Sequence, residues 1–385
     1  MTAPAPPAGS SIGRRRPVDR IRGWLGPEGP DAVGSWLSAR VLVVAGLALS
    51  AAIASKVNEV SPGTHLKHVG LLGWDAHFYA DIARVGYGGV SPETRRFFPL
   101  LPMLTWLFGA GGHATGVVLI VLVNVLAFGY GVALIKLARF EGMSVETARK
   151  AVWLLALAPP AFVLVMGYTE ALAGLLAVIV FYGIRSGRWW LAAGAGLLSG
   201  LCRPPGALLL VPVAIEVWRS RALVQPWIPR VAAVVAPVLG AVAYLTYVGI
   251  RFGDPLQPLS VQQNPQLHGP LISPITLIRR ALSAGSHGVG TTLHLPWLLL
   301  FAVLLVIMAR RLPASYTAWS ALALVSTLAG SNLASVERYC WSAFPFVLVA
   351  ASLLGHRPMW RGVLAVSSAL LVVYSLMGFL TFFVP

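Results

Sequence analysis

Apolar segments recur along this chain and are separated by connections that are mostly short. The first, SWLSARVLVVAGLALSAAIA, covers residues 36–55 and is about as long as a helix that crosses a bilayer. Only 11% of the 385 residues are charged and 57% are hydrophobic, whereas a soluble domain carries about 25% charged residues. Because so few polar groups cannot cover a soluble surface, we predict an all-α polytopic membrane protein.

We expect about 11 transmembrane helices by the spanning-length rule. After the first, they fall near residues 114–137, 151–167, 170–185, 189–201, 206–218, 229–250, 293–309, 316–331, 340–354 and 361–381. Residues 1–35 are rich in Pro, Gly and Arg and lack an apolar core, so we expect a flexible cytoplasmic tail and not a signal peptide. Residues 36–385 are expected to form a single membrane domain, with long outer loops at 56–113 and 251–292.

The net charge of +16 is explained by membrane topology. With the N-terminus inside, most of the 29 Lys and Arg residues fall on the cytoplasmic side, as the positive-inside rule requires. We therefore expect membrane lipids and no nucleic acid as partners. The segment 97–110 leaves the topology open, because it is either a re-entrant helix or a true span. The two cysteines, Cys202 and Cys340, lie in apolar segments and indicate neither a disulfide framework nor a metal site.

The first outer loop contains the segment WDAHFYADIARVGY, residues 74–87. Its apolar residues Trp74, Phe78, Ile82 and Val85 recur at helical spacing and predict one apolar stripe. A helix of this length is expected to lie along the membrane interface and not to cross it.

The same segment has two carboxylates, Asp75 and Asp81. Six residues on a helix correspond to a rotation of about 240°, so these two groups do not form a paired-carboxylate site. Asp75 shares a neighbouring face with Tyr79 instead. It is the single candidate carboxylate, with capping of the helix as the structural alternative.

Further ionisable residues lie in or beside apolar stretches on the same predicted outer side. They are Glu93, Arg96, Glu170, Arg203, Glu337 and Arg338. Ionisable residues at membrane depth are costly and are usually functional or paired. Each has a structural alternative, since Glu337 and Arg338 could form a local ion pair and Arg203 could reach the surface. Their convergence on one side of the membrane favours a shared site.

Six pieces of the chain resemble motifs of the PIG-V family of mannosyltransferases, which are membrane glycosyltransferases of the C-type fold. In chain order they are WDAHFYADIARVGY, Glu93 with RRFFPLLP, GYTEAL, LLSGLCRPPG, GDPL and RYCWSAFP. The first motif and FFPLLP are the most specific, and the pieces extend over most of the chain after residue 70. The chain departs from the family at CRPPG, where an Arg-Ser-Asn-Gly type sequence is expected. Arg203 is retained and the Asn is lost, so no role of that Asn is carried over.

The resemblance implies transfer of a mannosyl residue from a polyprenyl-phosphate-linked donor on the outer face of the cell membrane, with inversion at the anomeric carbon. It also implies that Asp75 is the catalytic base. The acceptor, whether a lipid, a glycan or a protein, and the linkage are not indicated.

The residue types fit such chemistry. An inverting transfer needs one general base for the acceptor hydroxyl and donors or cations for the departing phosphate, and arginine binds phosphate oxygens with a planar fork. The candidate substrate-binding residues are His77, Glu93, Arg96, Glu170, Arg203, Arg338 and Tyr339. The sequence has no nucleotide-phosphate loop and no clear metal-ligand spacing, so no cofactor is required. A divalent metal held by Asp75 and Glu93 is the less favoured alternative.

Two other classes of function compete with a transferase. A transporter or lipid flippase would show repeated halves with interrupted helices in matching positions. The break at Arg203-Pro204-Pro205 favours it, whereas the absence of an internal repeat and the clustering of polar residues in outer loops do not. The third class is a structural partner of a cell-envelope complex.

Overall fold

The structure is a computed structural model. It describes residues 26–382, except 62–64, 110–111, 113, 223–225, 265–266, 268, 271, 284–288, 330–332 and 334. Within these residues every element is a helix. The α-helices are α2 Gly29–Val60, α3 Asp75–Val85, α4 Leu100–Gly109, α5 Thr115–Phe140, α6 Val145–Leu157, α7 Glu170–Arg185, α8 Trp189–Cys202, α9 Leu210–Arg219, α10 Trp227–Phe252, α11 Gln257–Ser260, α12 Pro274–Ser283, α13 Val289–Arg311, α14 Ala314–Leu328, α15 Val336–Ser342, α16 Phe344–Leu353 and α17 Arg357–Phe379. Four 3-10 helices join them: η1 Pro92–Arg96, η2 Pro159–Leu164, η3 Pro204–Leu209 and η4 Val261–Gln263.

Five helices in the described part of the chain are long and apolar enough to cross a membrane, namely α2, α5, α10, α13 and α17. They confirm a helical membrane protein with several spans. The other predicted spans correspond to shorter helices, such as α8 with 14 residues and α16 with 10. The total of about 11 spans therefore stays a prediction.

Helix α2 begins earlier than expected. Residues 1–25 of the predicted tail lie outside the described residues, but residues 29–35 already belong to α2. Asp31 explains this start, because its carboxylate accepts hydrogen bonds from Arg149 Nε (2.6 Å) and Trp153 Nε1 (2.9 Å) of α6. Residues 29–35, which we had placed in the tail, are therefore helical, and α2 continues past residue 55 to Val60.

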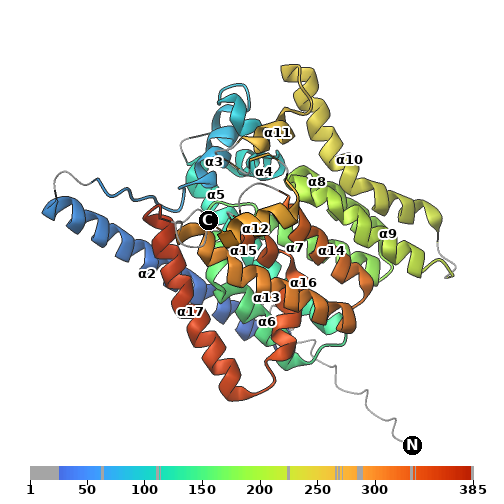
Figure 1. Ribbon diagram of the computed structural model, residues 1–385. Coiled ribbons are helices and arrows are strands. Elements are labelled where there is room, and N and C mark those ends of the chain that lie inside the picture. The colour runs from blue at the N-terminus through green and yellow to red at the C-terminus, as the bar shows by residue number, and fades with distance from the viewer. Residues whose placement is uncertain are drawn as a thin grey trace, which may run out of the picture.

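The elements of the first predicted outer loop gather at one end of the molecule, where α3 packs against α4 and η1 packs against α11 (Figure 1). Two arginines meet the start of α2, with Arg139 3.2 Å from Glu28 and Arg149 2.6 Å from Asp31. Since α2 connects these two regions, they lie at opposite ends of the bundle (Figure 1).

The interior of the bundle depends on a close approach of α8 and α10. A Cβ atom added at Gly200 would lie 2.0 Å from the carbonyl oxygen of Pro237, and one added at Gly240 would lie 2.0 Å from that of Leu197. Small residues at such crossings allow the backbones of membrane helices to touch. This contact fixes the end of α8, which leads directly into Arg203.

A substitution on α8 tests this contact. We expect Gly200→Ala to destabilise the protein by several kcal/mol or to prevent folding, because the new methyl group overlaps backbone atoms that cannot rotate away. Gly194→Ala is the matched control, since a Cβ at Gly194 has no atom within 4 Å and Ala gains about 1 kcal/mol of helix propensity over Gly. Thermal unfolding in detergent micelles measures both variants. Equal melting temperatures would show that the helices can separate without cost.

Candidate active site

Asp75 is the first residue of α3 and follows a strained residue. Trp74 has φ 56° and ψ −129°, a conformation that bulky residues rarely adopt. Its indole Nε1 donates a hydrogen bond of 2.9 Å to the carbonyl of Gly378 near the end of α17. Trp74 occupies the N-cap position and Asp75 is already the first helical residue, so Asp75 is not the N-cap of α3.

The apolar stripe predicted for α3 was wrong in part. The buried residues of the helix are Ala76, Tyr79, Ile82 and Ala83, whereas Val85 is 49% exposed. Trp74 is not part of the helix, so its side chain does not continue the helical phase of Phe78. Burial, followed by the nearby charge of Asp75, raises the pKa of Tyr79 well above its ordinary value, so its hydroxyl group stays protonated.

Two arginines from distant parts of the chain face the Asp75 carboxylate. Arg96, at the end of η1, places a terminal nitrogen 3.7 Å from Oδ1. Arg338, in α15, places a terminal nitrogen 3.5 Å from Oδ2. The Asp75 side chain is 31% exposed and that of Arg338 only 5%. The carboxylate is therefore accessible, while one of its cations is buried beneath it.

A second carboxylate lies deeper in the same cluster. Glu170 is the first residue of α7, and its side chain is 3% exposed. Its Oε1 lies 3.3 Å from Nη1 of Arg203 and 3.6 Å from Nε of Arg338. Arg338 thus bridges Asp75 and Glu170, and a chain of alternating charges runs from Arg96 to Arg203.

The position of Arg203 follows from its sequence. Pro204 disfavours helical backbone at the preceding residue, and Arg203 is extended, with φ −167° and ψ 155°. The helix therefore ends at Cys202. Arg203 leaves the apolar interior at this break and reaches Glu170.

Two tyrosines line the arginines of the cluster. The guanidinium carbon of Arg338 lies 4.5 Å from the ring centre of Tyr339 and 5.2 Å from that of Tyr168, and Arg203 lies 4.9 Å from the ring of Tyr339. Arg338 Nη2 also donates a hydrogen bond of 2.7 Å to the Tyr339 hydroxyl. The Tyr168 hydroxyl accepts a bond of 3.3 Å from the backbone N–H of Asp75. These contacts fix the guanidinium planes and join α3 to the segment before α7.

The neighbour of Arg96 has a different task. Arg95 donates a hydrogen bond of 2.6 Å to Gln257 of α11 and lies 3.8 Å from the ring centre of Phe252. The Tyr244 hydroxyl donates to the carbonyl of Arg95 at 2.7 Å. Arg95 therefore attaches η1 to α10 and α11, and this leaves Arg96 directed toward Asp75.

Three guanidinium groups face two carboxylates, so the cluster carries one excess positive charge. Its ion pairs measure 3.3–3.7 Å, longer than the about 2.7–2.9 Å of charge-assisted hydrogen bonds. The arginines therefore keep hydrogen-bonding capacity for an anionic ligand.

The structure brings together six of the eight residues predicted from the sequence. They are Asp75, Arg96, Glu170, Arg203, Arg338 and Tyr339. His77 is exposed, with its ring centre 3.8 Å from that of Phe78, and Glu93 is exposed on η1. Neither belongs to the ion-pair cluster. In the described residues no group of three or more His, Cys, Asp or Glu is placed to hold a metal ion.

Sequence reasoning missed one participant and did not identify the partner of another residue. Tyr168 lies within the motif GYTEAL, but we assigned no role to it. Glu337 does not pair with its neighbour Arg338; its Oε2 lies 2.7 Å from Nδ1 of His294 on α13. Adjacent helical residues point in different directions, so Glu337 holds α13 while Arg338 faces the cluster.

No protein-family model matches the chain, and a search of curated proteins gives no significant match. The geometry of the cluster and the motifs of the sequence therefore carry the functional argument.

Replacement of the buried carboxylate tests the cluster as a unit. We expect Glu170→Gln to lower the free energy of unfolding by roughly 3 kcal/mol, because Arg203 and Arg338 would lose their shared counter-charge in a buried site. Glu59→Gln is the control, since the Lys56–Glu59 pair is exposed and such pairs contribute little. Denaturant titration in micelles compares the two. A Glu170→Gln protein as stable as the control would show that Arg203 and Arg338 do not need the Glu170 carboxylate.

Proposed function

We propose that this protein is a glycosyltransferase that moves a mannosyl residue from a polyprenyl-phosphate-linked donor to an acceptor on the outer face of the membrane, with inversion. The observation that carries the proposal is one accessible carboxylate, Asp75, that faces two arginines from separate segments. A third arginine, Arg203, joins the same cluster through the buried Glu170. The motifs shared with the PIG-V family supply the donor and the reaction type.

In this proposal Asp75 is the general base. The acceptor hydroxyl oxygen attacks the anomeric carbon and its proton passes to the Asp75 carboxylate. The bond between the anomeric carbon and the phosphate oxygen breaks, and polyprenyl phosphate leaves with the electron pair. The exposure of Asp75 supports this role, because a base must be within hydrogen-bonding reach of the hydroxyl group that it deprotonates.

The arginines then bind the phosphate. The departing group gains negative charge as the glycosidic bond breaks, and fixed cations lower the energy of that state. The excess positive charge and the long ion pairs around Arg96 and Arg338 leave donors for phosphate oxygens. Glu170 and Tyr339 orient the guanidinium groups, and His77 and Glu93 lie beside the cluster as contacts for the remainder of the substrate.

The fold is part of the proposal. About 11 spans and a C-type glycosyltransferase fold are what the family resemblance implies, with the site facing outside the cytoplasm. The five long apolar helices and the gathering of α3, η1 and α4 at one end of the bundle support this arrangement.

Substitution of the base is the decisive experiment. Purified protein in lipid is incubated with radiolabelled polyprenyl-phosphate mannose and a membrane extract as the acceptor pool. We expect Asp75→Asn to lower transfer at least a hundredfold, because a general base contributes about 10²–10⁴-fold, while the protein remains folded. Asp81→Asn is the matched control on the same helix, since Asp81 pairs with Arg84 at the surface.

Full activity of Asp75→Asn would remove it as the base. Solute or lipid movement without a new glycosidic product would favour the transporter alternative. If the folded native protein transfers no label, other polyprenyl-linked sugars are the next donors to test.

A further inference from the structure

Arg40 and Asn124 are polar residues well inside two long apolar helices. At 1.5 Å per residue, Arg40 lies roughly 16 Å from the start of α2, and Asn124 roughly 14 Å from the start of α5. Both helices are long and apolar enough to cross a membrane. Polar groups at such depth are rare and usually have a specific task, and neither residue belongs to the candidate active site.

The Arg40 side chain makes three hydrogen bonds across the bundle. Its Nε donates to Oδ1 of Asn124 at 2.8 Å, Nη1 to the carbonyl of Trp36 at 3.1 Å and Nη2 to the carbonyl of Leu164 at 3.2 Å. Its guanidinium carbon also lies 4.5 Å from the Trp36 ring centre. In the described residues no carboxylate lies within ion-pair distance of Arg40, so its partners are neutral dipoles.

Asn124 completes the network. Its Nδ2 donates to the carbonyl of Ile120 at 2.7 Å and to that of Val165 at 3.1 Å, and the indole nitrogen of Trp36 donates to the backbone carbonyl of Asn124 at 2.9 Å. The orientation of the amide is determined, since only its oxygen can accept from Arg40 and only its nitrogen can donate to a carbonyl.

These donors act on a break between α6 and α7. Ala158 is extended and is followed by Pro159-Pro160, which ends α6. The chain then forms η2 and an irregular stretch up to Thr169, so the carbonyls of Leu164 and Val165 have no α-helical partners. In a membrane, non-helical backbone is tolerated only where protein groups satisfy it. Arg40 and Asn124 provide those groups.

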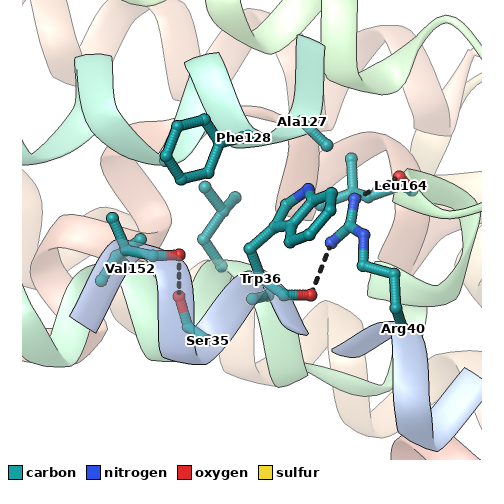
Figure 2. A pocket seen from close by; sticks show the side chains of 11 residues that line it. Ser35, Trp36, Arg40, Ala127, Phe128, Val152 and Leu164 are labelled. Atoms are coloured by element: carbon teal, nitrogen blue, oxygen red, sulfur yellow. Dashed lines mark hydrogen bonds between the residues drawn. The ribbon is translucent and has the colours of Figure 1, made fainter. Parts of the chain in front are cut away.

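The space beside Arg40 does not indicate a ligand. Figure 2 shows a cavity whose lining includes Trp36, Arg40, Phe128 and Leu164, and its volume is about 20 Å³. Small-molecule sites measure roughly 300–1,000 Å³. Because the cavity is too small for a substrate and Arg40 already bonds three acceptors, a structural task for Arg40 is the better explanation.

The segment held by this network leads directly to the active site. Three residues after Val165, Tyr168 accepts a hydrogen bond from the backbone N–H of Asp75. Glu170, two residues further on, binds Arg203 and Arg338. Gly167 packs against α3, where an added Cβ would lie 3.1 Å from Cβ of Ala76. A displacement of Leu164 and Val165 would therefore move Tyr168, which accepts from the backbone N–H of Asp75. It would also move Glu170, which binds the arginine that faces the Asp75 carboxylate.

We propose that Arg40 and Asn124 are positioning residues, which hold the segment 164–170 by satisfying its carbonyls and so align Asp75 and Glu170. The catalytic part of this proposal rests on the proposed transferase function. The structural part, the fixing of segment 164–170, does not.

Hydrogen exchange tests the structural part without any substrate. We expect Arg40→Gln, in lipid nanodiscs, to speed amide exchange at residues 164–170 about tenfold, because a charge-assisted hydrogen bond is lost. Ser50→Ala is the matched control, since Ser50 is buried in the same helix and bonds only to Leu47 within it. Unchanged exchange in Arg40→Gln would overturn the proposal.

Asn124→Asp tests the hydrogen bond to Val165 separately from the hydrogen bond to Arg40. It also provides a second variant if Arg40→Gln does not fold. The carboxylate still accepts from Arg40, with added attraction, but it cannot donate to Val165. We expect faster exchange at 164–170 despite the new ion pair. Exchange at the native rate would show that the bond to Val165 does not hold the segment.

Transfer kinetics test the catalytic part. We expect both variants to lower kcat about tenfold with the KM for the polyprenyl-phosphate donor nearly unchanged, because displacement of segment 164–170 misaligns Asp75 and Glu170, whose contacts act mainly in the transition state. A rise in KM alone would contradict alignment of the base. If the native protein shows no transfer, the proposed function fails, whereas the exchange experiment still decides whether the segment is held.

Discussion

The architecture depends on the burial of Arg338. A guanidinium group that is 5% exposed within an apolar bundle is stable only if nearby groups neutralise it and satisfy its donors. Its partners Asp75, Glu170 and Tyr339 lie on three different helices. Compensation of one charge therefore brings α3, α7 and α15 together, and the candidate active site is the place where they meet.

Most residues of the site lie where regular helix stops. Asp75 follows the strained Trp74, Glu170 follows the irregular end of η2, and Arg203 precedes Pro204. At such points side chains leave the helix surface and backbone groups become free to bind. In a membrane those free groups must be satisfied by protein, which explains why polar side chains and helix breaks occur together. The break at Arg203 also ends α8 after 14 residues.

Much of the site was predictable because charges are conspicuous in an apolar sequence. Glu170, Arg203 and Arg338 stand out because an ionisable residue in an apolar segment costs free energy, and Asp75 was indicated by a motif. Their pairing was not predictable, since Glu337 and Arg338 are adjacent in sequence and yet face different helices. Tyr168 carries no charge, so it does not stand out in an apolar sequence. The apolar stripe predicted for α3 was wrong at Val85. Periodicity shows which residues share a helix face, but it does not show which face a neighbouring helix covers.

The bundle uses arginine in two physically distinct ways. Arg40 donates to neutral acceptors at 2.8–3.2 Å, so its donors are engaged and it stabilises backbone. Arg96, Arg203 and Arg338 face carboxylates at 3.3–3.7 Å, distances at which attraction remains but hydrogen bonds are long. If a phosphate replaced the carbonyl acceptors of Arg40, those backbone carbonyls would lose their hydrogen-bond donor. The long ion pairs of the cluster arginines can be replaced by contacts to a phosphate without this loss. In the proposed function, this difference in partner and distance separates the arginine that supports the site from the arginines that would bind the phosphate of the donor.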